Sequence, residues 1–265
     1  MLKKLQIVGF MSLFLASCTF KNPEIKGLVV FQKQGSGMRY FNANKDLLDF
    51  SKVDCQYSHG ETTSCETHLS PSFNWPKDSL QITDKIARSG DIAFKFENGP
   101  GDCGQHSKRL NQWNDCARDR ERSEISMKSL KVGDKEMWFK FSMFIPEYTK
   151  FDIPVSYSLW QLHSKSGPVN FMFRIDPKSN LVWADHVNND WGYGTRHYKI
   201  LDANEVKQRW NDFVVHIEFK KFPNKGFVRV FANNEIKVNY KGLTENQLSR
   251  QNYMKFGIYK SNISR

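Results

Sequence analysis

The chain has few of the patterns that mark metal, redox or membrane-spanning proteins. Its five cysteines and seven histidines form no Cys-x-x-Cys and no His-Glu-x-x-His spacing, so zinc and thiol redox chemistry have little support. No repeat or low-complexity segment occurs. The apolar stretch at residues 7–15 is too short to span a bilayer stably. A hydrophobic fraction of 39%, with 14% aromatic residues, is nevertheless ample for a packed core.

The N-terminus has the features of a secretory signal peptide over residues 1–17. Lys3 and Lys4 precede the apolar stretch, which ends in Leu15-Ala16-Ser17-Cys18. This ending resembles the bacterial lipobox, in which cleavage before the cysteine leaves a thiol that receives diacylglycerol. We therefore expect an exported lipoprotein, anchored through Cys18 to the bacterial cell envelope, at the outer membrane or in the periplasm. An ordinary signal peptide with a chance cysteine is the alternative.

Four cysteines remain after Cys18, an even number for an oxidising compartment, where disulfides persist. Two disulfide bonds are the natural interpretation, and four cysteines allow three pairings. We favour Cys55–Cys65 with Cys103–Cys116, because each pair closes a short local loop.

Acidic residues are outnumbered, with 28 Asp and Glu against 39 Lys and Arg, which gives a formal charge of +11. Removal of the signal peptide takes away two lysines and leaves about +9. This charge favours a polyanionic partner, and an exported protein meets acidic polysaccharide rather than nucleic acid. A basic surface adapted to no particular partner is the alternative.

The sequence predicts a tether over residues 18–40 and a single domain over residues 41–265. One short helix is expected near residues 202–208, and Asn233-Asn234 can form a hairpin turn because Asn tolerates positive φ. Many short strands separated by turns indicate an all-β sandwich or jelly roll. The expected strands cover residues 91–97, 122–127, 136–145, 157–163, 170–175, 181–186, 212–220, 226–232, 235–240 and 253–260.

Three of these expected strands carry polar residues two positions apart, therefore on one face. They are Arg122-Ser123-Glu124-Ile125, Gln161-Leu162-His163 and Tyr253-Met254-Lys255-Phe256-Gly257-Ile258-Tyr259. Taken singly, an Arg-x-Glu pair is more often a surface ion pair, and a histidine beside apolar residues is more often structural. Together they can line one sheet surface.

These three segments resemble, in the same order, the motifs of jelly-roll polysaccharide lyases grouped with heparin lyase I and related to alginate and glucuronan lyases. The resemblance covers roughly residues 85–260. It implies a concanavalin-like β-jelly-roll sandwich with a concave active-site sheet. Lys260-Ser261 replaces the Asn-Gln that is typical of alginate lyases, which lowers the case for alginate.

The resemblance implies an exported polysaccharide lyase that cleaves a uronic-acid-containing polymer by β-elimination, giving unsaturated oligosaccharides. Such chemistry needs a base for the C5 proton, an acid for the leaving oxygen, and groups that neutralise the carboxylate. His163 suits the base, because its ordinary pKa leaves imidazole neutral at neutral pH. Tyr259 suits the acid, while Arg122 and Gln161 can bind the carboxylate. Some related enzymes use the tyrosine as both base and acid.

Further residues are candidates for substrate binding rather than chemistry, with Glu124 expected to orient Arg122. Gly257 would leave the surface open to a sugar. Trp183 is expected in the core. The candidates for substrate binding are Lys255, Tyr253, Glu124, Trp191 and His186, with Arg196, His197 and Lys199 as further cationic contacts.

No cofactor is required for this chemistry. A structural calcium ion is an open alternative, although no compact Asp-rich loop calls for one. We expect a monomer that binds acidic polysaccharide and no nucleic acid. A non-catalytic carbohydrate-binding lipoprotein on the same fold is the alternative. A jelly-roll glycoside hydrolase is disfavoured, because no Glu-x-Asp occurs in the chain.

Overall fold

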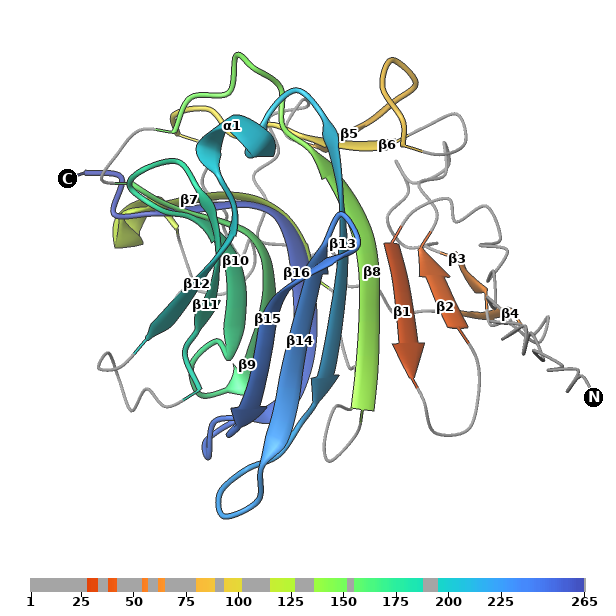
Figure 1. Cartoon of the computed structure of the whole chain (residues 1–265). Coiled ribbons are helices and arrows are strands. Elements are labelled where there is room, and N and C mark those ends of the chain that lie inside the picture. Colours follow the sequence, from red (N-terminus) through yellow and green to blue (C-terminus); the bar gives the residue numbers. More distant parts are fainter. Residues whose placement is uncertain are drawn as a thin grey trace, which may run out of the picture.

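The structure is a computed structural model that describes residues 80–88, 93–101, 115–126, 136–151, 155–187 and 195–264, together with four short strands before residue 65. Two antiparallel sheets form the body of the molecule (Figure 1). No helix in the described ranges is long and apolar enough to cross a membrane.

The larger sheet has eight strands in the order β15-β14-β13-β8-β1-β2-β3-β4. Its strands are β1 (Leu28–Gln32), β2 (Met38–Phe41), β3 (Asp54–Gln56), β4 (Thr62–Ser64), β8 (Glu136–Phe144), β13 (Trp210–Glu218), β14 (Gly226–Ala232) and β15 (Glu235–Gly242). The long β8 and β13 pair antiparallel over nine residue pairs in the centre of this sheet, which ties the two halves together.

The smaller sheet has six strands in the order β12-β11-β10-β9-β16-β7. Its strands are β7 (Arg120–Ser126), β9 (Ser156–Ser166), β10 (Phe171–Ile175), β11 (Leu181–Asp185), β12 (Arg196–Leu201) and β16 (Arg250–Ser261). The remaining elements are the pair β5 (Leu80–Thr83) and β6 (Ala93–Phe96), the 3₁₀ turn η2 (Cys116–Arg118) and the helix α1 (Ala203–Val206). The strands β9 and β16 curve along their length (Figure 1).

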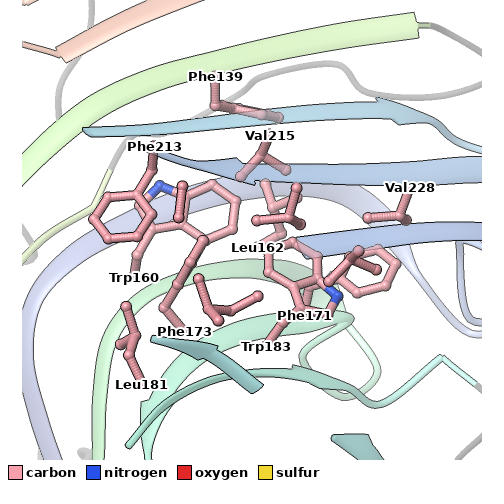
Figure 2. Close-up of a cluster of buried hydrophobic side chains, with 14 of the residues drawn as sticks. Phe139, Trp160, Leu162, Phe171, Phe173, Leu181, Trp183, Phe213, Val215 and Val228 are labelled. Atoms are coloured by element: carbon pink, nitrogen blue, oxygen red, sulfur yellow. The ribbon is translucent and has the colours of Figure 1, made fainter. Parts of the chain in front are cut away.

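The core lies between the two sheets, and aromatic residues fill much of it (Figure 2). Phe139 from the larger sheet and Trp160 and Phe173 from the smaller one are at most 1% exposed. The Trp160 ring centroid lies 5.4 Å from that of Phe139 and 5.7 Å from that of Phe173. Full burial of such a side chain contributes about 1.5–3 kcal/mol. One face of the six-stranded sheet is therefore committed to the core, which leaves the other face for polar groups.

The predicted all-β jelly-roll sandwich is confirmed, and β14 has the predicted bounds. The hairpin turn is also confirmed, because Asn233 and Asn234 have φ values of 50° and 69°. The predicted helix is a single turn, Ala203–Val206, begun by Asp202, whose backbone N–H donates to Glu205 Oε2 at 3.0 Å. The strands β1 to β5 and β12 were not predicted; β12 lies at a sheet edge and begins with four residues, Arg196–Lys199, that include no aliphatic side chain.

Several predictions concern the N-terminal part of the chain. β1 lies inside the 18–40 range predicted as a tether, and it pairs with β8 on one side and β2 on the other within the larger sheet. The predicted signal peptide and the predicted lipidation site Cys18 lie outside the described residues, and both stay predictions. So do the side chains of the four other cysteines, and both disulfide bonds therefore stay predictions.

Candidate active site

The strands β9, β16 and β7 lie side by side, and their register brings the three predicted motifs together. Tyr259 stands opposite Arg122 on β7, and Lys255 stands opposite Gln161 on β9. Two residues further along β9, His163 stands opposite Tyr253 on β16. Because directly opposite residues of an antiparallel pair share a face, these side chains lie on one surface of the sheet.

This surface is the face turned away from the core. Trp160, Leu162 and Met254 alternate with the polar residues along β9 and β16, and all three are at most 1% exposed within the core. Along β16 the order Tyr253, Lys255, Tyr259 places the lysine between the two tyrosines. His163 and Tyr259 therefore stand at opposite ends of the cluster, with the Gln161–Lys255 pair between them.

Glu124 is the common acceptor of this cluster and is 3% exposed. Its Oε1 accepts from Gln161 Nε2 at 2.5 Å, and its Oε2 lies 3.4 Å from both Arg122 Nη1 and Lys255 Nζ. A buried carboxylate with three donors fixes the position of each, since charge-assisted hydrogen bonds are directional and strong. The expectation was that Glu124 orients Arg122; the contact between the two is present, and the role itself stays a prediction.

Asp115 is a member of the cluster that sequence reasoning missed. It is fully buried, and its carboxylate grips Arg122 at two points, with Oδ2 2.5 Å from Nε and Oδ1 2.7 Å from Nη2. The residue stands beside η2, seven positions before Arg122, where no strand period relates the two. Only the fold shows that this acid, among several in the segment, meets the arginine.

His163 is held in a neutral form. Its Nδ1 lies 2.6 Å from the backbone oxygen of Ser164, and a carbonyl oxygen can only accept, so Nδ1 carries the proton and Nε2 the lone pair. Burial, with a further contribution from the charge of Lys255, lowers the pKa of His163 to about 4. The imidazole stacks on Tyr253 with ring centroids 5.3 Å apart.

Burial has the opposite effect on the tyrosines, because their charged form is the deprotonated one. It raises the pKa of Tyr259 above its ordinary value and that of Tyr253 to about 12. The guanidinium carbon of Arg122 lies 4.8 Å from the centroid of the Tyr259 ring. Burial also lowers the pKa of Lys255. At neutral pH the site therefore holds a neutral imidazole and a protonated phenol.

Gly257 is required by the backbone rather than by an approaching sugar. Its φ is +129°, and a Cβ there would lie 2.2 Å from the carbonyl oxygen of Ser123 on β7. The β16–β9 register shifts between Phe256 and Tyr259, so this glycine lies where the strand is irregular. This steric reason is separate from the expectation that Gly257 leaves the surface open to a sugar, which stays a prediction.

The other candidates lie further along the sheet or outside the described ranges. His186 directly follows β11, two strands from β9, where its Nδ1 is 3.2 Å from Thr195 Oγ1. Trp183 is 1% exposed and packs in the core, as predicted. Arg196 forms an ion pair with Asp185, with Nη2 2.5 Å from Oδ2. Trp191 lies outside the described residues, and those that are described contain no group of three or more His, Cys, Asp or Glu suited to a metal ion.

The fold is a β-sandwich, and this cluster gathers charged and titratable side chains on the outer face of one of its sheets. The family model described as "Polysaccharide lyase" matches residues 49–265. The chain therefore belongs to the polysaccharide lyase family, and it is an enzyme that acts on a polysaccharide.

Comparison with solved structures agrees with the fold. The endo-β-1,4-glucuronan lyase from the fungus Trichoderma reesei is similar with a TM-score of 0.51 and 15% identity, covering 73% of this chain and 82% of that one. An alginate lyase from Chlorella virus has a TM-score of 0.35 and 13% identity, with 52% and 72% covered. A search of curated proteins returned no match.

Proposed function

We propose that this enzyme cleaves a uronic-acid-containing anionic polysaccharide by β-elimination and releases unsaturated oligosaccharides. The observation that carries the proposal is a neutral His163 and a protonated Tyr259 at opposite ends of one cluster of carboxylate-binding groups. Elimination needs a base and an acid in those protonation states at the same pH. The cluster supplies both.

In this proposal Nε2 of His163 takes the C5 proton of the uronate. The C–H electron pair forms the C4–C5 double bond as the C4–O bond breaks, and the Tyr259 hydroxyl gives its proton to the leaving oxygen. The raised pKa of Tyr259 keeps that proton in place until the bond breaks, which favours the acid role over the base role. An anionic sugar beside His163 would raise the low pKa of the imidazole and strengthen it as a base.

The carboxylate of the bound sugar must be stabilised as negative charge develops on it. Gln161 gives one amide N–H to Glu124, and its second N–H can donate to the sugar. Arg122 and Lys255 carry two positive charges, which Asp115 and Glu124 balance before substrate binds. A sugar carboxylate would therefore bind to a rigid, charge-balanced site and favour the charged form of Lys255.

The polymer and the location are narrower parts of the proposal. The similarity to a glucuronan lyase supports glucuronan as the first polymer to test, and the charge of +11 supports an acidic substrate. The order of the three motifs supports a place in the group of heparin lyase I. The lipobox-like Leu15-Ala16-Ser17-Cys18 supports an exported, lipid-anchored enzyme of the bacterial envelope.

A screen of purified polyuronates tests the proposal. Glucuronan, alginate and heparin are supplied to the enzyme, and the ultraviolet absorbance of the conjugated double bond is followed. We expect growth of absorbance with at least one polymer, abolition by Tyr259→Phe, and wild-type rates for the control Tyr148→Phe, which alters a tyrosine that is 74% exposed. Full activity of Tyr259→Phe would overturn its role as the acid.

A further inference from the structure

The polar face of the six-stranded sheet continues beyond the catalytic cluster. The row that begins with Arg122 and Tyr259 crosses β9 at Ser158 and reaches Arg174 on β10. It then passes Val182 on β11 and ends at Lys199 on β12. Neighbouring strands lie about 4.8 Å apart, so Arg174 starts roughly 10 Å from Tyr259.

Arg174 is on the same face as the catalytic residues, because Phe173 and Ile175 on either side of it are buried in the core. Its Nη2 donates to Ser156 Oγ at 2.5 Å. Among the residues that the structure describes, no carboxylate forms an ion pair with this arginine. Arg122 and Arg196, by contrast, are each paired with a buried aspartate.

A half-buried arginine that has no ion-pair partner lowers the stability of the folded protein. Burial lowers the pKa of Arg174, and no neighbouring acid offsets this. A guanidinium favours bidentate binding to a carboxylate, so an arginine without an internal partner is suited to an external one. Retention of the charge on the substrate-binding face points to an anionic ligand.

Two histidines add neutral hydrogen-bonding groups beside this charge. His197 stands opposite Ala184 on the exposed side of β12, and Arg174 lowers its pKa in addition to the effect of burial. His186 has its Nε2 buried with no hydrogen-bond partner in the described part of the chain. The charge of Asp176 acts on the pKa of His197 in the opposite direction, but this carboxylate accepts from the Lys178 and Asn180 backbone N–H groups of its own turn.

We propose that Arg174, with His186 and His197, forms a second anion-binding position that takes the carboxylate of another sugar of the same polymer. The chain of the substrate would then cross the strands from β7 and β16 toward β12. The identity of the ligand as a uronate rests on the proposed function, whereas the position of the site rests on the contacts of Arg174.

The test compares Arg174→Gln with Arg229→Gln, which removes the same charge from an exposed position on the other sheet. Initial rates on glucuronan and alginate are measured by ultraviolet absorbance. Loss of one charge-assisted contact predicts a KM raised roughly 10-fold or more with kcat within about twofold, partial recovery in Arg174→Lys, and no change in Arg229→Gln. An unchanged KM, or a fall in kcat alone, would overturn the site.

A separate measurement keeps this inference apart from the proposed function. If no polymer yields unsaturated product, the proposed function fails, and the same variants are compared by retardation in gels that contain glucuronan or alginate. Weaker retardation of Arg174→Gln than of wild type and Arg229→Gln then supports the site. Equal retardation, or none in any of the three proteins, would refute it.

Discussion

Replacement of Asp115 by Asn tests whether this buried carboxylate holds Arg122 in place. Asn keeps the size of the side chain but loses the charge. In Asn, an NH₂ group also replaces one of the two carboxylate oxygens that now accept from Arg122, so a donor there faces a guanidinium N–H. Arg122 would keep one neutral acceptor at that position and the more distant Glu124, whose Oε2 is 3.4 Å from Nη1. The variant therefore breaks the two-point grip without opening a cavity.

The expected loss follows from the burial of the pair, in which Asp115 is fully buried and the Arg122 side chain is 10% exposed. Breaking such a pair costs about 3–5 kcal/mol. Because Asn retains one hydrogen bond, we expect the free energy of unfolding to fall by about 3 kcal/mol. In a domain of this size that lowers the midpoint of thermal unfolding by about 6–12 °C.

Thermal and urea unfolding of the variant measure the loss, and initial rates on an active polymer measure its effect on Arg122. The matched control is Glu235→Gln, which removes a carboxylate that meets Lys237 at 2.7 Å while 73% exposed. We expect this control to unfold and react like wild type. If Asp115→Asn matched wild type in both stability and kcat, the positioning role of Asp115 would be refuted.

The remaining predictions concern pH and the backbone. Since the free enzyme holds the pKa of His163 at about 4, kcat/KM should fall on the acid side near pH 4, and a limb near pH 6.5 instead would contradict the lowered pKa of this imidazole. Burial also lowers the pKa of His186 to about 4, so between pH 6.5 and 4 the unfolded chain binds more protons than the folded one. Each histidine should thus reduce the free energy of unfolding by about 3 kcal/mol as pH falls through that window. Urea titrations should show half of the wild-type pH dependence of stability in His163→Gln. A wild-type stability that does not change with pH would exclude the lowered pKa values. Gly257→Ala should lower the free energy of unfolding by more than about 2 kcal/mol, because the strained φ and the 2.2 Å clash of the new Cβ with the Ser123 carbonyl oxygen add up. Gly101→Ala measures the backbone strain alone, because Gly101 has a φ of +86° and a Cβ there would meet no atom within 4 Å. Equal losses in the two alanine variants would show that the clash is relieved.

Local patterns predicted the fold well where one face of a strand is buried. In β13, Phe213, Val215 and Ile217 share one face and are at most 1% exposed, whereas His216 and Glu218 take the other face, so period-two alternation located the strand. The same pattern placed Arg122 and Glu124 on one face before any pairing was known. It failed for β12, an edge strand in which only Ile200 and Leu201 at the end are buried and the residues before them are polar or aromatic.

Contacts between distant segments could not be read from the sequence. Asp115 reaches Arg122 only because η2 packs beside β7, and Glu124 receives donors that are 37 and 131 residues away. Arg174 was not predicted as a site residue, since a single arginine between two core positions gives no signal until its row across the sheet is known. The order in which the strands pair brings the site residues together, and the residue pattern of a single strand does not show this order.

The products of wild type and of His163→Ala and Tyr259→Phe test the central claim most directly. Mass spectrometry of the oligosaccharides separates elimination from hydrolysis, since an unsaturated product is lighter than its saturated counterpart by one water molecule. We predict that every non-reducing end newly formed by wild type is unsaturated, so that only the fragment carrying the original non-reducing end of the polymer is saturated, and that both variants form essentially no new ends while remaining folded. Saturated non-reducing ends at newly cleaved positions, or undiminished release by either variant, would contradict the account.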